Sequence, residues 1–256
     1  MKVGEQMQDK AKKEISRSVD NAIRIIECYA EKEERGISEL ARELDLSKAS
    51  VARIVASLER GKFLMQNPDT GKYRLGVGMM LYGYLARDRN ELANALTPAM
   101  QSIAHKYQST THLATLIGSE LMIINKTSAG PFVYMSSRVG GTLHAHATAV
   151  GKCILAYLDE AKQQEYLSNA KLYKLTEKTI TDREQLNKVL MQIRKDGYSV
   201  DDEEAHDGLY CIAVPVFDVS KKPIAALSVS GRKELLSARK KEIVEDLYST
   251  IKESIG

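Results

Sequence analysis

Apolar residues recur every three or four positions through residues 16–60, and this spacing predicts three helices. The first is expected from about Ser16 to Glu33, with Gly36 as a C-terminal glycine. Its expected buried face consists of Val19, Ala22, Ile23, Ile26 and Ala30. The second helix is expected to begin with Ser38 as its N-cap. Its expected buried residues are Leu40, Ala41 and Leu44.

The third expected helix, between an N-cap at Ser47 and a terminating Gly61, has two faces of different composition. Its apolar stripe consists of Val51, Ile54, Val55 and Leu58. The opposite side carries Ala49, Arg53, Ala56 and Arg60, flanked by Ser50 and Ser57. Small side chains and arginines let a helix approach a DNA groove while keeping donors for bases and phosphates. The pattern therefore predicts the recognition helix of a helix-turn-helix motif, with Lys48 as a phosphate contact.

Residues 63–76 predict a hairpin directly after this helix. Two short strand-like runs flank Asn67-Pro68-Asp69-Thr70-Gly71, which is a strong turn signal. A hairpin in this position is the wing of a winged helix-turn-helix, and Lys72 and Arg74 occupy positions suited to phosphate contacts.

A linker is expected over residues 77–96, helical over 78–94. This helix has more apolar surface than the short segments next to it in the chain could cover, which suggests self-association through this helix. These positions are Met79, Met80, Leu81, Tyr84 and Leu85. A new helix is expected to start at Thr97-Pro98 and to run to about Tyr107, because proline is favoured at a first helical position.

The remaining chain mixes strand and helix signals, which predicts an α+β domain built on an antiparallel sheet. Two strands are expected on either side of Gly118-Ser119 within residues 111–127. Further strands are expected at 132–138, 209–217 and 223–231. Helices are expected at 148–158, 159–168, 182–195 and 237–254.

Composition narrows the class of protein. The chain has 256 residues, 43% hydrophobic and 28% charged, with a net charge of +3, which is typical of soluble globular proteins. The longest uncharged apolar stretch, residues 75–86, is too short to span a bilayer, and no secretory signal is evident. We therefore expect a cytoplasmic protein without a membrane partner. Three scattered cysteines argue against a disulfide framework or a structural zinc site.

Six segments in this order resemble the IclR family of transcriptional regulators over nearly the whole chain. The N-terminal segments are RSVDNAIRIIE (17–27), ISELARELDLSKASVARIVASLERGKFL (37–64) and GKYRLG (71–76). The C-terminal segments are LHAHATAVGKCILAYL (143–158), GYSVDDEEAHDGLYCIAVPVFD (197–218) and IAALSVSG (224–231).

The resemblance implies a domain order: a flexible arm (1–14), a winged helix-turn-helix domain (15–76), the linker (77–96) and a GAF-like effector-binding domain (97–256). It also implies homodimers or homotetramers on a palindromic double-stranded DNA operator, with repression as the commoner outcome and no cofactor. The expected DNA contacts are Arg17, Ser47, Lys48, Ala49, Ser50, Arg53, Ser57, Lys72 and Arg74.

The same resemblance implies a small-molecule effector, commonly a carboxylate, bound by the C-terminal motifs. Carried over by position, the expected contacts are Ala149, Val150, Gly151, Asp201, Cys211, Ser228 and Ser230, with Phe132 and Met135 as apolar wall. The physical sense is that free amides at the start of a helix can hold an anion and that alternate strand serines can donate hydroxyls. Val150 is bulkier than the residue often found there in the family.

Two other classes of function stay open. A metal-dependent hydrolase could use His144, His146 and the run Asp201-Asp202-Glu203-Glu204. Two histidines are a weak metal signal and an acidic run is more often a solvated turn, so we expect neither a catalytic nor a metal site. A sensor module without DNA binding is the other alternative, and for it an alanine at Arg53 changes nothing.

Overall fold

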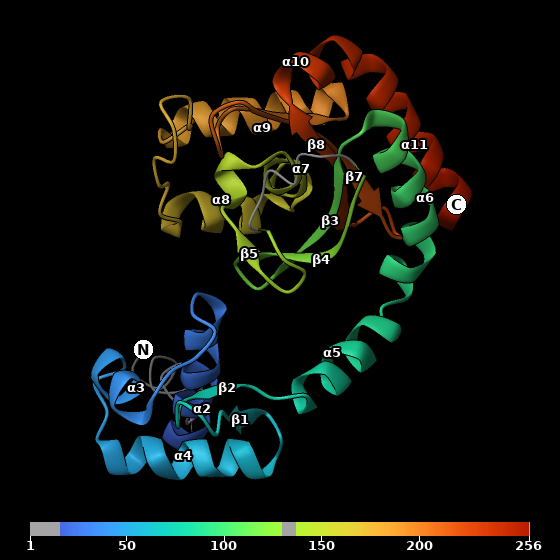
Figure 1. The fold of residues 1–256 in the computed structure, drawn as a ribbon. Coiled ribbons are helices and arrows are strands. Elements are labelled where there is room, and N and C mark those ends of the chain that lie inside the picture. The colour runs from blue at the N-terminus through green and yellow to red at the C-terminus, as the bar shows by residue number, and fades with distance from the viewer. Residues whose placement is uncertain (1–15, 130–136, 256) are drawn as a thin grey trace. The chain divides into compact units, whose positions relative to one another are not determined.

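The computed structural model describes residues 16–129 and 137–255, and the chain divides into two compact units between Arg89 and Asn90 (Figure 1). Each unit has its own hydrophobic core. No helix within the described residues combines the length and apolar character needed to cross a membrane.

The first unit contains helices, a hairpin and a closing helix. In chain order these are α2 (Arg17–Glu27), α3 (Ile37–Glu43), α4 (Lys48–Arg60), β1 (Leu64–Gln66), β2 (Tyr73–Leu75) and α5 (Gly78–Asp88). Its core is formed by α2, α3, α4 and the hairpin, with Ile25, Leu40, Val51 and Val55 fully buried. The expected winged helix-turn-helix fold is confirmed.

The predicted buried face of the first helix is wrong. Helix α2 ends at Glu27, and a 3-10 turn over Cys28–Ala30 follows. The core side carries Ile25, Cys28 and Tyr29, whereas Val19 is 59% and Ile23 51% exposed. The segment has apolar residues on two adjacent sides, so periodicity alone chose the wrong one.

The predicted start of the second helix is also wrong. The N-cap of α3 is Gly36, not Ser38, and Gly36 therefore does not end the first helix. The Gly36 N–H donates to Glu39 Oε2 at 2.9 Å, which satisfies an amide at the helix start without a capping serine.

The predicted boundaries of α4 and of the wing are confirmed. Ser47 is the N-cap of α4, its Oγ accepting from the Ser50 N–H at 3.2 Å, and Gly61 is the C-cap. Strands β1 and β2 pair antiparallel, with Leu64 opposite Leu75. The turn between the two strands is held to the segment that precedes α3, because Asn67 Nδ2 donates to Glu34 Oε1 at 2.7 Å.

Helix α5 is fixed to the hairpin at its start. The Gly78 N–H donates to the Lys62 carbonyl at 2.9 Å, and the Phe63 ring stacks on Tyr82 with centroids 5.3 Å apart. A Cβ on Gly78 would lie 2.6 Å from the Lys62 carbonyl oxygen, so only glycine fits this close approach.

The linker was predicted with the wrong boundaries. Helix α6 (Glu91–Tyr107) begins at its N-cap Asn90, whose Oδ1 accepts from the Ala93 N–H at 3.0 Å, and Pro98 lies inside it. Buried Leu96 and Met100 hold the helix on both sides of the proline. An interior proline removes one helix hydrogen bond and crowds the carbonyl four residues earlier, and here the buried face of α6 offsets that cost.

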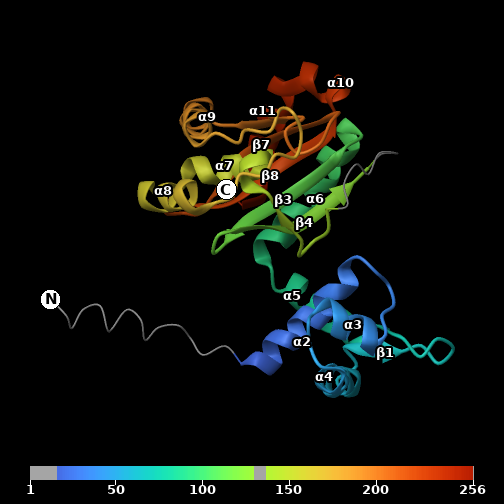
Figure 2. The ribbon, with the colours of Figure 1, turned by 90° about the vertical axis from the view of Figure 1, so that its left-hand side faces the viewer.

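The second unit is a six-stranded antiparallel sheet of order β5-β4-β3-β8-β7-β6. The strands are β3 (Thr110–Ile117), β4 (Glu120–Ser128), β5 (Thr142–Leu143), β6 (Ser199–Asp202), β7 (Leu209–Phe217) and β8 (Pro223–Arg232). Helices α6 and α11 (Lys240–Ile255) pack on one face of the sheet. Helix α7 (Ala149–Tyr157) packs on the other face and contacts α9 (Arg183–Asp196), and α8 (Glu160–Asn169) follows α7 on that side (Figure 2).

The second unit confirms most of its predicted elements. The last helix begins at Lys240 rather than 237, because α10 (Lys233–Leu236) and a 3-10 turn precede it. The expected strand at 132–138 lies mostly outside the described residues, and 137–138 are not in a strand. Strand β6 was missed, because its acidic residues looked like a solvated turn.

Candidate functional site

The exposed side of α4 carries the side chains predicted for DNA contact. Val51 and Val55 are fully buried on one side of the helix, while Ala49, Arg53 and Ser57 are exposed on the other. Ser57 Oγ donates to the Arg53 carbonyl at 3.0 Å, a bond within the helix, and the Arg53 side chain is exposed. Small residues around one long cationic side chain give this helix a surface that can approach a groove closely.

Helices α2 and α4 enclose a groove of about 580 Å³ beside this surface. Four predicted contacts line it together: Arg17, Ser50, Arg53 and Ser57. Ser47, Lys48 and Ala49 are exposed at the N-terminal end of α4. The groove thus combines two guanidinium groups with hydroxyl donors on adjacent helices.

The two wing residues differ in their surroundings. Arg74 is exposed on β2. Lys72 is half-buried, and its Nζ lies 3.3 Å from Glu39 Oε1. The Gly36 N–H and the Lys72 ammonium lower the pKa of Glu39 to about 2, so the lysine already has an ionised partner. A phosphate contact by Lys72 requires it to leave or share that partner.

A small inner cavity lies between the start of α7 and one face of the sheet. Its volume is about 20 Å³, room for about one water molecule. Six predicted effector contacts line it: Ala149, Val150, Asp201, Cys211, Ser228 and Ser230. The other lining residues, which sequence reasoning missed, are His112, Leu143, Thr148 and Leu209. Phe132 and Met135 lie outside the described residues.

Strand register explains why these side chains converge. Asp201 on β6 lies opposite Cys211 on β7, which lies opposite Ser230 on β8. Ser228, two residues before Ser230, lies opposite His112 on β3. Directly paired residues, and residues two apart on one strand, project from the same face of a sheet. Four strands therefore contribute polar groups to one small volume.

The start of α7 offers two amides to this cavity rather than three. Gly151 was expected to present a free amide, but its N–H donates to Thr148 Oγ1 at 3.3 Å. Among the described residues, the N–H groups of Ala149 and Val150 have no acceptor, as expected for the first turn of a helix. Gly151 serves packing instead, since a Cβ there would lie 2.3 Å from the Ala145 carbonyl oxygen.

Asp201 is fully buried and only half satisfied. Its Oδ1 accepts from the N–H groups of Glu204 at 2.7 Å and Ala205 at 3.2 Å. Its Oδ2 is buried without a hydrogen-bond partner in the described part of the chain. Burial raises the pKa of Asp201 to about 6, against the lowering effect of the Lys152 ammonium.

A buried ion pair lies directly behind the cavity. Lys152, 1% exposed, pairs with Glu204, and desolvation raises the pKa of Glu204. The acidic run was expected to be a solvated turn, and that is wrong for Asp201 and Glu204. The alternation of Ser199, Val200, Asp201 and Asp202, with the first and third buried, is the strand signal that could have shown it.

His112 adds a neutral imidazole to the cavity. Its Nε2 lies 3.0 Å from Ser137 Oγ and its Nδ1 lies 3.4 Å from Ser230 Oγ. Burial, with a smaller effect from Lys126, lowers the pKa of His112 to about 3, so the ring is uncharged at neutral pH.

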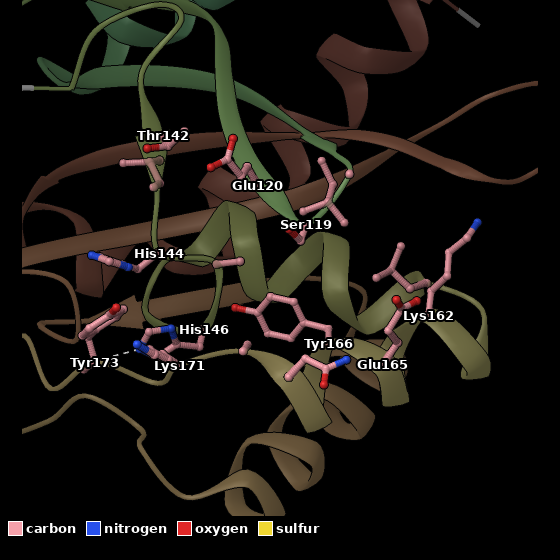
Figure 3. A pocket seen from close by; sticks show the side chains of 17 residues that line it. Ser119, Glu120, Thr142, His144, His146, Lys162, Glu165, Tyr166, Lys171 and Tyr173 are labelled. Atoms are coloured by element: carbon pink, nitrogen blue, oxygen red, sulfur yellow. Dashed lines mark hydrogen bonds between the residues drawn. The ribbon is translucent and has the colours of Figure 1, made fainter. Parts of the chain in front are cut away.

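A larger outer cavity of about 840 Å³ lies at the β5 edge of the sheet, beside α8 (Figure 3). His144 and His146 line it, with the rings of His144 and Tyr173 5.2 Å apart. His146 Nε2 lies 3.0 Å from the Tyr173 carbonyl oxygen. Glu120 and Tyr166 are on its walls (Figure 3).

The residues of the hydrolase alternative do not converge on one cavity, and Asp202, Glu203 and Glu204 line neither of the two. The histidines line the outer one and Asp201 lines the inner one. Within the described residues, no group of three or more His, Cys, Asp or Glu side chains is arranged to hold a metal ion.

Two family models match the chain. The model described as "Bacterial transcriptional regulator IclR C-terminal" matches residues 85–253, and the IclR helix-turn-helix domain model matches residues 18–68. Together they cover both units, and the first alone covers more than half of the chain.

Curated relatives and solved structures agree with these models. The transcriptional regulator XynR of Escherichia coli is 33% identical over 217 residues, 84% of this chain and 86% of the relative. The transcriptional repressor IclR of the same organism is 30% identical, over 84% of this chain and 79% of the relative. The crystal structure of an IclR homologue from Microbacterium hydrocarbonoxydans, complexed with 4-hydroxybenzoate, matches with a TM-score of 0.81 and 25% identity. It covers 93% of this chain and 98% of that chain.

Proposed function

This chain belongs to the IclR family of DNA-binding transcriptional regulators with a ligand-binding C-terminal domain. From this we propose which part of the chain binds DNA and which part binds the effector. Helix α4 enters the major groove of an operator, and the inner cavity binds a small carboxylate effector. The observation that carries the proposal is that one chain holds both an exposed α4 surface and a buried polar cavity.

Within the DNA-binding unit, base and phosphate contacts are divided by position. Arg53, Ser50 and Ser57 read bases, a role supported by their position along the groove between α2 and α4. Arg17, Lys48 and Arg74 are placed for phosphates, and Lys72 joins them by releasing Glu39. Ser47 and Ala49 lie at the helix start, where backbone approach to the duplex is closest.

The operator is a palindrome read by two subunits, with half-sites about one helical turn, ~34 Å, apart. Helix α5 supports self-association because Met80 is 73% and Tyr84 65% exposed, and Leu81 and Tyr82 are also exposed. Contact between the α5 helices of two subunits gives a dimer, and a second contact between two dimers gives a tetramer. Repression, the role of the relative IclR of Escherichia coli, is the expected sign of regulation. Operator binding requires that the protein act in the cytoplasm, beside the chromosome.

The effector is held by groups that suit a carboxylate. The Ala149 and Val150 N–H groups can receive the anion at the start of α7, and Ser228 and Ser230 can donate hydroxyls to it. Gly151 lets the start of α7 approach the Ala145 backbone closely. Cys211 contributes an uncharged, polarizable side chain to the cavity wall.

The cavity must enlarge to admit any such ligand, because it now has room for about one water molecule. A ligand that enlarges it binds the expanded arrangement better than the present one. That difference in affinity is what an effector needs to shift the equilibrium between DNA-competent and DNA-incompetent states.

The test is an in vitro selection of genomic fragments from the protein's own host, at physiological salt. We expect a few palindromic sites, whose flanking genes identify the regulated pathway. The selected site then serves for affinity measurements on Arg53→Ala, with a loss of ~1–3 kcal/mol expected. Lys195→Ala, which removes an exposed charge in the second unit, is the matched control. Diffuse, salt-sensitive binding alone, or unchanged affinity in the Arg53 variant, contradicts the proposed reading helix.

A further inference from the structure

The outer cavity of the second unit is large enough to admit a small molecule without rearrangement. Its volume of about 840 Å³ falls within the roughly 300–1,000 Å³ of typical small-molecule sites, whereas the inner cavity has room for about one water molecule. It lies between the turn that joins β3 to β4, the segment from β5 to His146, and α8 (Figure 3). The function proposed above leaves this cavity unused.

Aromatic rings contribute to the wall of the outer cavity. His144 and Tyr173 are both exposed, with ring centroids 5.2 Å apart and an angle of 51° between the ring planes. Tyr166 projects from α8 into the same space (Figure 3), and the half-buried side chains of Leu116 and Leu158 add aliphatic surface. Because exposed rings can stack on a planar ligand or pack edge to face against it, this lining favours an aromatic compound.

The charged groups of the outer cavity are balanced in sign. Its lining contains two carboxylates and two ammonium groups: Glu120, Glu165, Lys162 and Lys171. Lys162 already pairs with Asp159, with 3.1 Å between Nζ and Oδ2. Equal numbers of opposite charges give no net attraction for either an anion or a cation. A ligand matched to this cavity is therefore uncharged.

Uncharged polar groups remain to orient such a ligand. Burial raises the pKa of Tyr166, against the opposing effect of the His146 backbone N–H, so its hydroxyl keeps its proton and can donate. Thr142 and Asn169 add a second hydroxyl and a side-chain amide to the lining. A few polar groups on a largely apolar wall are what fixes the orientation of a small molecule in its site.

A continuous set of hydrogen bonds leads from this wall to Asp201. Tyr173 lies in the segment between α8 and α9, and its carbonyl accepts from His146 Nε2 at 3.0 Å. In the same segment, Thr179 Oγ1 donates to the Glu204 carbonyl at 2.6 Å. The Glu204 N–H donates in turn to Asp201 Oδ1 at 2.7 Å, and Asp201 lines the inner cavity. A ligand that fixes Tyr173 therefore acts on the backbone that positions Asp201.

We propose that the outer cavity is a second small-molecule site, which takes an uncharged, planar aromatic compound with a hydrogen-bonding group and transmits its occupancy to Asp201 through the segment between α8 and α9. The choice of ligand follows from the aromatic lining and the balanced charges, and the transmission follows from the bonds of Thr179 and Glu204. The inference goes beyond the proposed function, because neither part depends on which ligand the inner cavity binds.

The first experiment uses indole as the probe, because indole is planar, uncharged and has an N–H donor. The chain has no tryptophan, so indole fluorescence excited beyond the absorption of tyrosine reports the ligand alone. We expect saturable binding to the full chain. Tyr173→Ala and His144→Ala should each weaken it about three- to tenfold, the range for an aromatic contact. Tyr173→Phe, which keeps the ring, should bind as the wild type does.

Leu175→Ala is the matched control, since it shortens an exposed side chain of the same segment that does not line the cavity. It should bind indole with wild-type affinity. Absence of indole binding, unchanged binding in both Tyr173→Ala and His144→Ala, or equal weakening in Leu175→Ala overturns the proposed site. Indole-3-propionate and tryptamine carry opposite charges, and a tenfold preference for either over indole overturns the assignment of an uncharged ligand.

The second experiment tests the transmission by hydrogen exchange of backbone amides. With indole at about ten times its dissociation constant, exchange should slow by up to about tenfold in residues 170–182 and 199–206, because indole binds only the closed arrangement. The second range contains the Glu204 N–H that Asp201 accepts. Slowing confined to the residues that line the cavity overturns the transmission to Asp201. Slowing in 199–206 that persists undiminished in Tyr173→Ala overturns the route through Tyr173.

Discussion

Two buried carboxylates, Asp201 and Glu204, lie in the field of one buried ammonium, that of Lys152, which pairs with Glu204. Neither carboxylate is fully satisfied, since one oxygen of each lacks a partner among the described residues. Burial raises the pKa of both carboxylates, so the stability of the second unit should depend on pH through them.

The pH dependence has a definite sign. The pKa of Asp201 is raised from 3.8 to about 6, so between these values the folded protein keeps a proton that the unfolded chain releases. This contribution to stability is fully present below about pH 4 and is lost as the pH rises through 6. Relative to Asp201→Asn, the wild type should lose up to about 3 kcal/mol of unfolding free energy between pH 4 and pH 7.

Urea unfolding of both proteins at pH 4, 5, 6 and 7 measures this difference. Asp207→Asn, which changes an exposed aspartate, should follow the wild-type curve. Parallel curves for wild type and Asp201→Asn would show that Asp201 titrates near its ordinary value.

A glycine gives a second prediction at residue scale. In Gly151→Ala the added methyl group would lie 2.3 Å from the Ala145 carbonyl oxygen, so the backbone must move. We expect a loss of about 2 kcal/mol or more of unfolding free energy, in the range for overpacking. Gly83→Ala, in α5 with nothing within 4 Å, should instead gain up to about 1 kcal/mol from helix propensity. Thermal unfolding of the two variants compares them, and a stable Gly151→Ala would contradict the close contact.

Much of the inner cavity could be predicted at residue scale because its chemistry lies in short motifs. The serines of β8 alternate along an obvious strand, and Cys211 lies inside an apolar run. Asp201 was placed at the site by resemblance alone, since its run of acids hid a strand. His112 could not be found, because its importance comes from pairing opposite Ser228, and register is not visible in one strand.

At the scale of elements, the N-caps of α4 and α2 differ in whether the capping side chain makes a hydrogen bond. Ser47 Oγ accepts from the Ser50 N–H, whereas Ser16, the N-cap of α2, makes no side-chain cap bond. Ser47→Ala should therefore cost about 1 kcal/mol and Ser16→Ala close to nothing. Chemical denaturation of both variants tests this. Equal losses would mean that the cap bond contributes nothing specific to α4.

The elements also show where periodicity suffices and where it fails. Helix α4 was predicted at both ends because a capping serine and a glycine bound a single apolar stripe. Helix α2 carries apolar residues on two sides, and only packing against α4 selects Ile25 over Ile23. For α6, the proline suggested a boundary that the Asn90 cap and a continuous buried face override.

At the scale of the whole molecule, α5 exposes four large apolar side chains within 11 residues: Met80, Leu81, Tyr82 and Tyr84. None of its residues is buried, and Met80 and Tyr84, one turn apart, project to one side. Replacing both with serine should lower the molecular mass measured by light scattering or raise the dimer dissociation constant at least tenfold. Val219→Ser, at a fully exposed loop position, is the control. An unchanged mass across the concentration range would place self-association elsewhere.

Because α5 is bound to the segment before the hairpin at one end, a movement of its other end can be transmitted to the hairpin. It has 11 residues and is therefore about 16 Å long. Its first residue, Gly78, is held by the Lys62 carbonyl, and its fifth residue, Tyr82, stacks on the ring of Phe63. A shift of its far end by about 3 Å corresponds to a tilt of roughly 10° over that length. Because the near end is bound to the hairpin, such a tilt either breaks the ring stack or turns the wing with it. If an effector alters DNA binding as proposed, the stiffness of the Phe63–Tyr82 stack should influence how strongly the wing responds.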